Sequence, residues 1–303
     1  MEIELTPVYP YSFKETVLSH GWVSLPSFFW DMQHEKLHRV ELLKSGEVVK
    51  LHIGEIGNPP NQGKVKITVE CIKELTPLDE TEICNKVKCM LRLEEDLSEF
   101  YDLCLEYKEF HWVSERGAGR FLRSSNIFED IIKIICTTNT NWSQTTAMVT
   151  RLVEKLGLAY AEDKSSQAFP TPEAIVQGGI DLLKDEIKLG YRSEFVFELS
   201  QNNHNDLEDL NKYQSHRIDS EVLRQRLMKL KGIGPYAASH LLVFLGYYDH
   251  LGVDTEMRSF VSQKYFNGQR VTDDEILKVY HKWGKWKYLV YWAERKRGLK
   301  NIE

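Results

Sequence analysis

Residues 231–246 read KGIGPYAASHLLVFLG and decide the fold of this 303-residue chain. The preceding run VLRQRLMKL (222–230) is amphipathic and predicts one helix, and the small and apolar residues after Pro235 predict a second. Pro235 suits the first position of that second helix, because its missing N–H would be unpaired there anyway. Gly232 and Gly234 stand in the short turn between the two helices. The stretch therefore predicts two helices joined by a tight glycine hairpin.

The two glycines favour a phosphate-binding role for this hairpin. Residues without side chains let the turn adopt positive φ angles and leave backbone N–H groups uncovered. A phosphate can then approach the positive N-terminus of the second helix closely, while Ile233 anchors the turn in the core. The alternative interpretation is a glycine-capped turn between two helices that holds no ligand.

An aspartate follows the second helix. Beyond a loop, the run GVDT (252–255) begins a further helix, and Asp254 can cap it. An N-cap aspartate is common and usually structural, but its pairing with a glycine hairpin at this separation is much rarer by chance. We therefore expect the Asp254 carboxylate to face whatever the hairpin holds.

Composition bounds the class of protein. An apolar content of 42% can supply a substantial core. The sequence lacks an apolar run of membrane-spanning length, and its start, MEIE, lacks the features of a signal peptide. We expect an intracellular protein, cytoplasmic in a prokaryote or nuclear in a eukaryote. The five cysteines lack the spacing of a zinc or iron–sulfur site, so free thiols and no bound metal are predicted.

The net charge and the charge distribution give opposite indications about a nucleic-acid partner. A net charge of −6 argues weakly against a nucleic-acid partner, because phosphate neutralisation supplies most non-specific affinity for DNA. Basic residues nevertheless crowd the last part of the chain, where a solvated helix face and a DNA contact are both open interpretations. These residues are Lys278, Lys282, Lys285, Lys287, Arg295, Lys296, Arg297 and Lys300.

Hydrophobic periodicity divides the chain into two parts. Alternating apolar residues in 48–53 and 65–69, separated by a turn at 57–60, predict antiparallel strands, and helical spacing begins at Asp79. After residue 115 helical patterns recur with almost no strand signal, and the stretch from Gln201 to Asn211 is predicted to be a loop. We predict an α+β domain over 1–115 and an all-α domain over 116–303.

The run KGIGPYAASHLLVFLG…GVDT resembles the helix-hairpin-helix motif and aspartate of the HhH-GPD base-excision DNA glycosylases. The segments FEDIIKIICTTNTNWSQTTAMVTRLVEKLG (128–157) and LGYRSEFV (189–196) resemble helices of its 3-methyladenine and 8-oxoguanine branches. The resemblance implies a TBP-like α+β domain with an antiparallel sheet and helices, followed by an all-α helix-hairpin-helix domain. It also implies double-stranded DNA containing a damaged base as the partner, and a monomer suffices for this class of enzyme.

The resemblance implies a role for Asp254 and a departure at Tyr236. The catalytic aspartate of the family falls on Asp254. Where the bifunctional enzymes carry a nucleophilic lysine this chain has Tyr236, and a phenol cannot form a Schiff base. We therefore expect a monofunctional glycosylase without a cofactor, which leaves an abasic site.

Other residues follow from the same resemblance. The DNA-binding set is Lys231, Gly232, Ile233, Gly234, Asn139 and Arg192. Asn139 matches the residue that fills the gap left by a flipped base, with a turn asparagine as the alternative. Arg192 matches a contact to the opposite base, with a surface ion pair as the alternative. A flipped base needs aromatic faces, and the predicted pocket is Tyr236, His240, Trp22, Trp30 and Tyr291, although we expect at least half of the nearby aromatics to be core.

The lesion and the activity are left with alternatives. Alkylated purines already carry positive charge and leave easily, so an aromatic pocket favours them over 8-oxoguanine. The alternatives are an 8-oxoguanine-type glycosylase with lyase activity, with Lys231 or Lys229 as nucleophile, and a non-catalytic DNA-binding protein in which Asp254 is only a helix cap.

Overall fold

The computed structural model describes residues 1–202 and 218–300. From residue 203 onward, the loop predicted for 201–211 lies outside the described residues. Contacts divide the chain into two compact units: unit 1 comprises Met1–Asp96 and Glu115–Lys212, and unit 2 comprises Leu97–Ser114 and Tyr213–Glu303. The units interleave along the sequence, so the predicted domains 1–115 and 116–303 stay a prediction.

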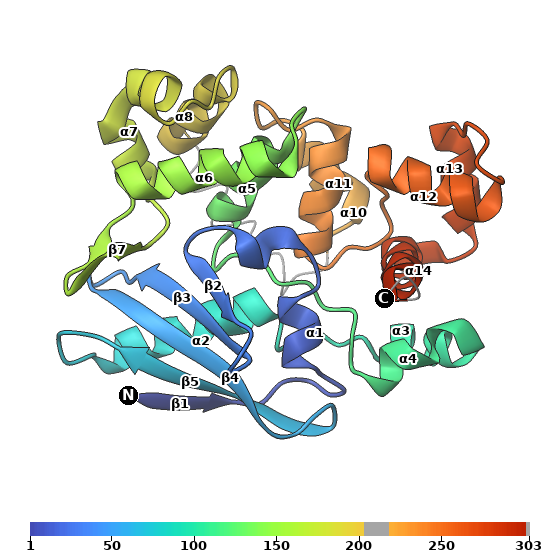
Figure 1. Cartoon of the computed structure of the whole chain (residues 1–303), viewed down its shortest axis with the longest axis horizontal. Helices are drawn as coiled ribbons and strands as arrows, with labels where there is room; N and C mark the ends of the chain where they lie inside the picture. The colour runs from blue at the N-terminus through green and yellow to red at the C-terminus, as the bar shows by residue number, and fades with distance from the viewer. Residues whose placement is uncertain (203–217, 301–303) are drawn as a thin grey trace. The chain divides into compact units, whose positions relative to one another are not determined.

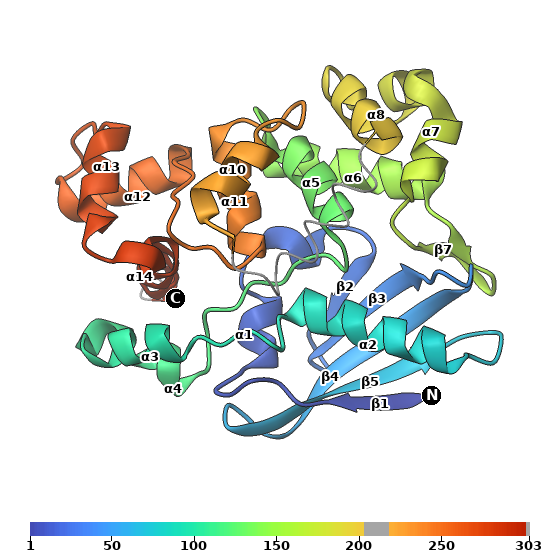
Figure 2. The ribbon, with the colours of Figure 1, turned by 180° about the vertical axis from the view of Figure 1, so that it is seen from behind.

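Unit 1 contains a five-stranded antiparallel sheet with strand order β1-β5-β4-β3-β2 (Figure 1). The strands are β1 (Glu2–Leu5), β2 (Phe28–Asp31), β3 (Lys36–Leu42), β4 (Val48–Asn58) and β5 (Gln62–Glu70). Alternate residues of β3 and β5 are buried, as the period of two requires when one face is packed. Helix α2 (Pro77–Leu91), which begins with a Thr76 capping box, lies along one face of this sheet (Figure 2).

Unit 1 also contains several helices besides α2. They include α1 (Phe13–Val17), α5 (Ile127–Thr137), α6 (Trp142–Leu156), α7 (Pro172–Asp181) and α8 (Arg192–Asn202). The expectation of an all-α second part is wrong in one place, because β6 (Ala159–Tyr160) and β7 (Asp163–Gln167) form a two-stranded ribbon. The sequence of β7, DKSSQ, has no apolar alternation that could have signalled a strand.

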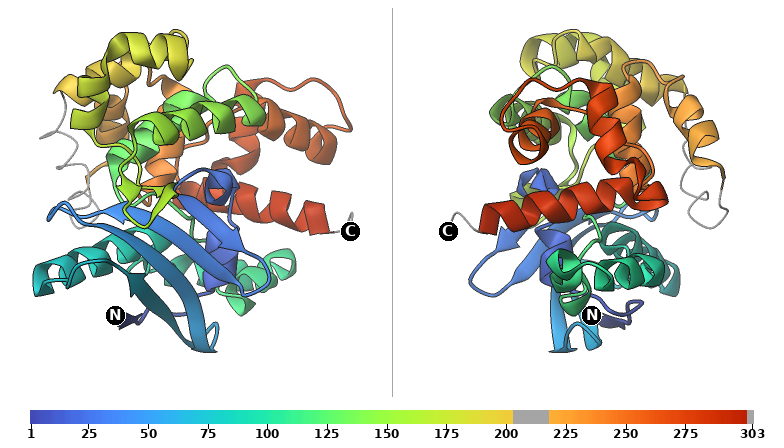
Figure 3. Two further views of the ribbon diagram at one scale, coloured as in Figure 1. Left: turned by 60° about the vertical axis from the view of Figure 1, so that its left-hand side comes forward. Right: turned by 90° about the vertical axis from the view of Figure 1, so that its right-hand side faces the viewer.

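Unit 2 is helical in the part that the structure describes. It contains α3 (Ser98–Leu105), α10 (Ser220–Leu227), α11 (Pro235–Phe244), α12 (Thr255–Tyr265), α13 (Asp273–His281) and α14 (Lys287–Lys300). The right-hand view of Figure 3 shows α14 as a long helix in the foreground. An antiparallel sheet with helices thus precedes a helical region, which confirms the predicted fold class. Among the described residues, no helix is both long and apolar enough to cross a membrane.

Candidate active site

The hairpin between α10 and α11 uses its two glycines differently. Gly232 has a φ of +87°, a conformation that favours glycine. Gly234 has a φ of −88° and is the N-cap residue of α11, so the expectation of positive φ is wrong for this residue. Ile233 between them is buried and anchors the turn.

Gly234 leaves the start of α11 open. The residue is exposed, and a Cβ atom placed on it would meet nothing within 4 Å among the described residues. In the same part of the chain, no side chain hydrogen-bonds to cap α11. The first N–H groups of the helix are therefore left to water or a ligand. Because neither φ nor the surrounding chain requires glycine here, its absence of a side chain fits the close approach of an external group.

Asp254 begins α12 in the same unit. It is the N-cap residue of that helix, and its Oδ1 accepts a hydrogen bond from the backbone N–H of Met257 at 2.7 Å. The residue is half-buried. One carboxylate oxygen thus fixes the orientation of the side chain while the carboxylate keeps further acceptor capacity.

Four rings interact with this carboxylate, two from α11 and two from α14. Ring centroids lie 4.3 Å apart for Tyr236 and His240, 6.0 Å for His240 and Tyr288, and 6.1 Å for Tyr288 and Tyr291. Burial, followed by the charge of Asp254 and a hydrogen bond to its carboxylate, raises the pKa of the Tyr236 phenol well above its usual range. Burial likewise raises the pKa of Tyr291 to about 12, with Arg295 opposing the shift and Asp254 adding to it. Both phenols therefore stay protonated at neutral pH.

Of these four rings, Tyr288 was not among the predicted pocket residues. Burial, the neighbouring tyrosines and Asp254 all raise the pKa of its phenol. Its spacing of three residues before Tyr291 places both rings on one face of α14, and this spacing is the signal that could have identified it.

Two predicted DNA-contacting residues of unit 1 lie beside an exposed tyrosine. Asn139 has a φ of +48° and its Nδ2 donates to the Tyr191 hydroxyl at 3.3 Å. Tyr191 is 50% exposed. Arg192 is buried, and its guanidinium donates to the backbone carbonyl of Thr138 and lies 4.6 Å from the Tyr191 ring centroid. Arg192 thus braces the backbone beside Asn139 in this structure, and its predicted contact to the opposite base stays a prediction.

The two predicted pocket tryptophans also lie in unit 1. Trp22 is 4% exposed and its ring N–H donates to Asp130 Oδ1 at 3.2 Å, which is a core environment. Trp30 is half-buried, with its ring centroid 6.0 Å from that of Phe13. Tyr236, His240 and Tyr291 are the predicted pocket residues that unit 2 brings together around Asp254.

The basic residues near the C-terminus make contacts within unit 2. Lys285 pairs with Glu99, Arg295 pairs with Glu256 at 2.5 Å, and Lys287 donates to the Asp249 carbonyl at 3.3 Å. Such pairing reduces the charge available for phosphates.

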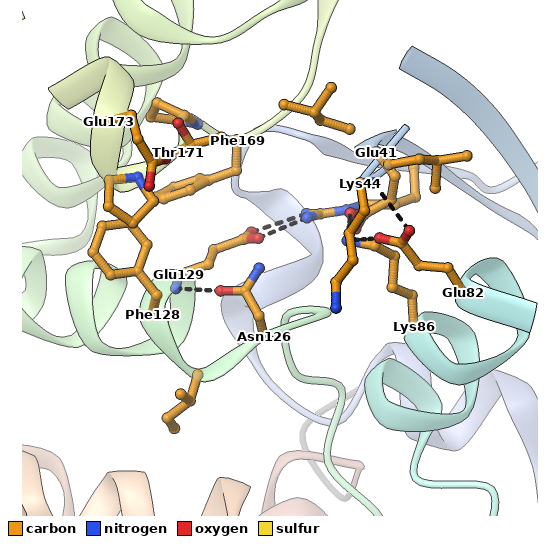
Figure 4. A pocket seen from close by; sticks show the side chains of 16 residues that line it. Glu41, Lys44, Glu82, Lys86, Asn126, Phe128, Glu129, Phe169, Thr171 and Glu173 are labelled. Carbon is orange, nitrogen blue, oxygen red and sulfur yellow. Dashed lines mark hydrogen bonds and ion pairs between the residues drawn. The ribbon is translucent and has the colours of Figure 1, made fainter. Parts of the chain in front are cut away.

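Unit 1 has a cavity of about 550 Å³ of its own (Figure 4). It lies between β3, α2, the start of α5 and the segment before α7. Arg39 forms two hydrogen bonds to Glu129 on its wall, and Lys86 pairs with Glu41. These charged groups therefore neutralise one another within unit 1.

Comparison with known proteins places the fold. No family model matches the chain. An N-glycosylase/DNA lyase of Saccharomyces cerevisiae is 28% identical over 141 residues, which are 43% of this chain and 37% of that relative's length. The solved 3-methyladenine DNA glycosylase of Archaeoglobus fulgidus is 20% identical, with a TM-score of 0.73 over 97% of both chains.

A second solved structure is similar over the same extent. The 8-oxoguanine glycosylase/lyase of Clostridium acetobutylicum, in complex with double-stranded DNA containing cytosine opposite 8-oxoguanine, is 19% identical, with a TM-score of 0.68 over 98% of both chains. The chain therefore has the fold of the helix-hairpin-helix DNA glycosylases, which confirms the resemblance. The similar structures include both 3-methyladenine and 8-oxoguanine enzymes.

Proposed function

We propose that this chain is a monofunctional DNA glycosylase that flips a damaged base, preferably an alkylated purine, from duplex DNA and hydrolyses its bond to the sugar. The observation that carries the proposal is the Asp254 carboxylate among four rings, in the same compact unit as an uncovered helix N-terminus. Similarity to DNA glycosylases over nearly the whole chain supports it.

The reaction follows from the charge that develops at the sugar. As the bond from C1′ to the base nitrogen breaks, its electrons leave with the base and positive charge grows on the sugar. The Asp254 carboxylate stabilises that charge and orients the attacking water, which adds to C1′ and loses a proton. The products are the free base and an abasic site.

DNA binding is assigned to the hairpin. Its open N–H groups at the start of α11 donate hydrogen bonds to a backbone phosphate, and the exposed Lys231 adds charge nearby. A single protein chain suffices, because every group assigned to the reaction at the sugar comes from unit 2.

Replacement of Gly234 by alanine tests the hairpin. We expect Gly234→Ala to fold normally, because its φ is allowed for alanine and the added Cβ has free space. Its affinity for duplex DNA should fall about tenfold, the effect of weakening one charge-assisted hydrogen bond. Binding titrations at fixed salt measure this loss, and Gly54→Ala, whose Cβ makes only ordinary contact, is the control. Equal affinity of the two variants for duplex DNA would show that the hairpin does not bind the DNA backbone.

Asn139 is proposed to fill the space left by the flipped base. We expect Asn139→Ala to slow excision from a fully paired duplex about tenfold, because unstacking costs a few kcal/mol that the wedge helps to offset. A lesion opposite a mismatch should show a smaller loss, since that base is already partly unstacked. Single-turnover excision on the two duplexes measures the difference. A loss of the same size on both would assign Asn139 to another role.

The absence of lyase activity is proposed from Tyr236. A glycosylase that uses water forms no covalent intermediate with DNA. Borohydride reduction during turnover should therefore trap no adduct with the wild-type protein. A trapped adduct that disappears in Lys231→Ala or Lys229→Ala would establish the lyase alternative.

The aromatic and anionic pocket favours bases that carry positive charge, because ring faces and a carboxylate both attract cations. An 8-oxoguanine-type activity is the second candidate, favoured by the similarity to the Clostridium enzyme and the yeast lyase. Excision from a panel containing 3-methyladenine, 7-methylguanine and 8-oxoguanine separates the two. A protein that binds DNA but releases no base from any lesion is the non-catalytic alternative.

A further inference from the structure

We infer that His240 selects the flipped base as a hydrogen-bond acceptor, so that its Nε2 receives an N–H group from the edge of the base. The inference rests on the proposed glycosylase function and specifies the chemistry of its substrate. A base that offers an N–H group toward His240 is accepted, and a base that offers only lone pairs there is rejected.

A backbone hydrogen bond sets the tautomer of the His240 imidazole. His240 Nδ1 lies 3.1 Å from the backbone carbonyl oxygen of Tyr236. A carbonyl oxygen can only accept, so Nδ1 carries the proton and donates. In a neutral ring the other nitrogen, Nε2, then has its lone pair available as an acceptor.

The neighbours of the His240 ring hold it rigidly. A Cβ on Gly252 would lie 2.6 Å from both Cε1 and Nδ1 of His240, so the glycine backbone packs directly against the imidazole. The Tyr236 ring lies 4.3 Å away on one side, and Tyr288 approaches edge-on at 6.0 Å. The imidazole is therefore fixed in one orientation by three neighbours.

Nε2 of His240 is available to a ligand. It has no hydrogen-bond partner among the residues that the structure describes, and it is not one of the fully enclosed polar atoms of that part of the chain. The residue is half-buried. Nε2 is thus a rigidly held acceptor beside Asp254. A base that enters among the four rings near Asp254 can donate a hydrogen bond to it.

Burial keeps the imidazole of His240 neutral at pH 7. Burial lowers the pKa of His240, while the hydrogen bond to Tyr236 and the charge of Asp254 act in the opposite direction. The other groups that face this cluster are Glu256 on α12, and Tyr288, Tyr291 and Arg295 on α14. Glu256 and Arg295 pair with each other at 2.5 Å, which largely cancels their effect.

This arrangement gives His240 a testable pH dependence. Protonation converts Nε2 from an acceptor into a donor, which then opposes the N–H of the base. Excision by the wild type should therefore fall on the acid side with a midpoint below the usual histidine value of 6.5.

The test is single-turnover excision of the best lesion of the panel between pH 5 and 8, with three variants. His240→Phe keeps a ring without an acceptor, and we expect it to lose about tenfold at pH 7, the effect of one hydrogen bond. His240→Gln offers a carbonyl acceptor that does not titrate. It should therefore recover part of the rate and lack the fall in rate on the acid side that protonation of His240 causes in the wild type. His281→Phe replaces an exposed histidine of α13 and should match the wild type.

Each outcome decides a separate question. A His240→Phe enzyme as fast as wild type, or faster than His240→Gln, would show that the ring acts by stacking and overturn the inference. A fall in excision rate at acid pH that persists in both His240 variants would also overturn the inference. Failure of the wild type to excise any lesion would instead contradict the proposed function itself.

Discussion

Asp254→Asn should lower the rate of base excision by a factor of about 10² to 10³, the usual effect of losing one preorganised electrostatic group at a reaction centre. The carboxamide cannot supply the negative charge that stabilises the sugar as the base departs. It can still cap α12, because asparagine is as good an N-cap residue as aspartate, and the Met257 N–H should keep its acceptor. Rate and stability are therefore separable in this variant.

Single-turnover excision and thermal unfolding measure the two effects side by side. Asp219→Asn is a matched control, because Asp219 caps α10 in the same unit by accepting from the N–H groups of Glu221 and Val222. Asp219→Asn should leave the rate unchanged, and both variants should keep wild-type stability and DNA affinity. Wild-type excision by Asp254→Asn would reduce Asp254 to a helix cap.

Asp254→Ala separates the two roles further. It removes both the charge and the cap, so it should add a loss of about 1 kcal/mol in the free energy of unfolding to the loss in rate. A variant that lost stability without losing rate would contradict the proposed reaction.

Local patterns predicted the parts of the fold whose causes are local. The amphipathic run before Gly232 and the proline after Gly234 defined the hairpin, because helix periodicity and proline geometry act within a few residues. The alternation in 65–69 identified β5 for the same reason. A glycine alone, however, does not reveal whether φ or free space requires it, and the two hairpin glycines turned out to differ.

Parts of the candidate site and of the core depend on contacts that local patterns do not contain. Tyr191 meets Asn139 across 52 residues of sequence, and the pairing appears only when α8 packs near the end of α5. Arg39 on β3 and Glu129 on α5 are separated by 90 residues. Periodicity assigned their segments to a strand and a helix, but it could not predict that two charged residues would be buried together.

This buried pair leads to the prediction with the largest expected effect on stability. Arg39 is 1% exposed and forms two hydrogen bonds to Glu129, at 2.9 and 2.6 Å, and one to Glu41 at 2.7 Å. Lys133 also pairs with Glu129, at 2.7 Å. We expect Arg39→Met to cost about 3 to 5 kcal/mol in the free energy of unfolding, because it leaves buried carboxylates without their main partner.

Urea denaturation of this variant should be compared with that of Lys155→Ala. Lys155 pairs with Glu186 at 2.5 Å, but both side chains are about half exposed. Exposed ion pairs contribute from about 0 to 1 kcal/mol, so this control should barely move the midpoint. Similar shifts for the two variants would show that burial of the Arg39 network does not determine its strength.

The same network should give unit 1 a characteristic sensitivity to acid. Burial alone would raise the pKa of Glu129, but Arg39 and Lys133 outweigh it and lower the pKa from 4.5 to about 2. A carboxyl group whose pKa is lower in the folded state than in the unfolded state stabilises the fold at every pH above its unfolded pKa. For Glu129 that contribution is lost as the pH falls from about 4.5 toward 2. Glu129→Gln removes this titration. The difference in unfolding free energy between wild type and Glu129→Gln should therefore be largest at neutral pH and shrink through this window, and a difference that stays constant with pH would mean that Glu129 is not held ionised by its two cations.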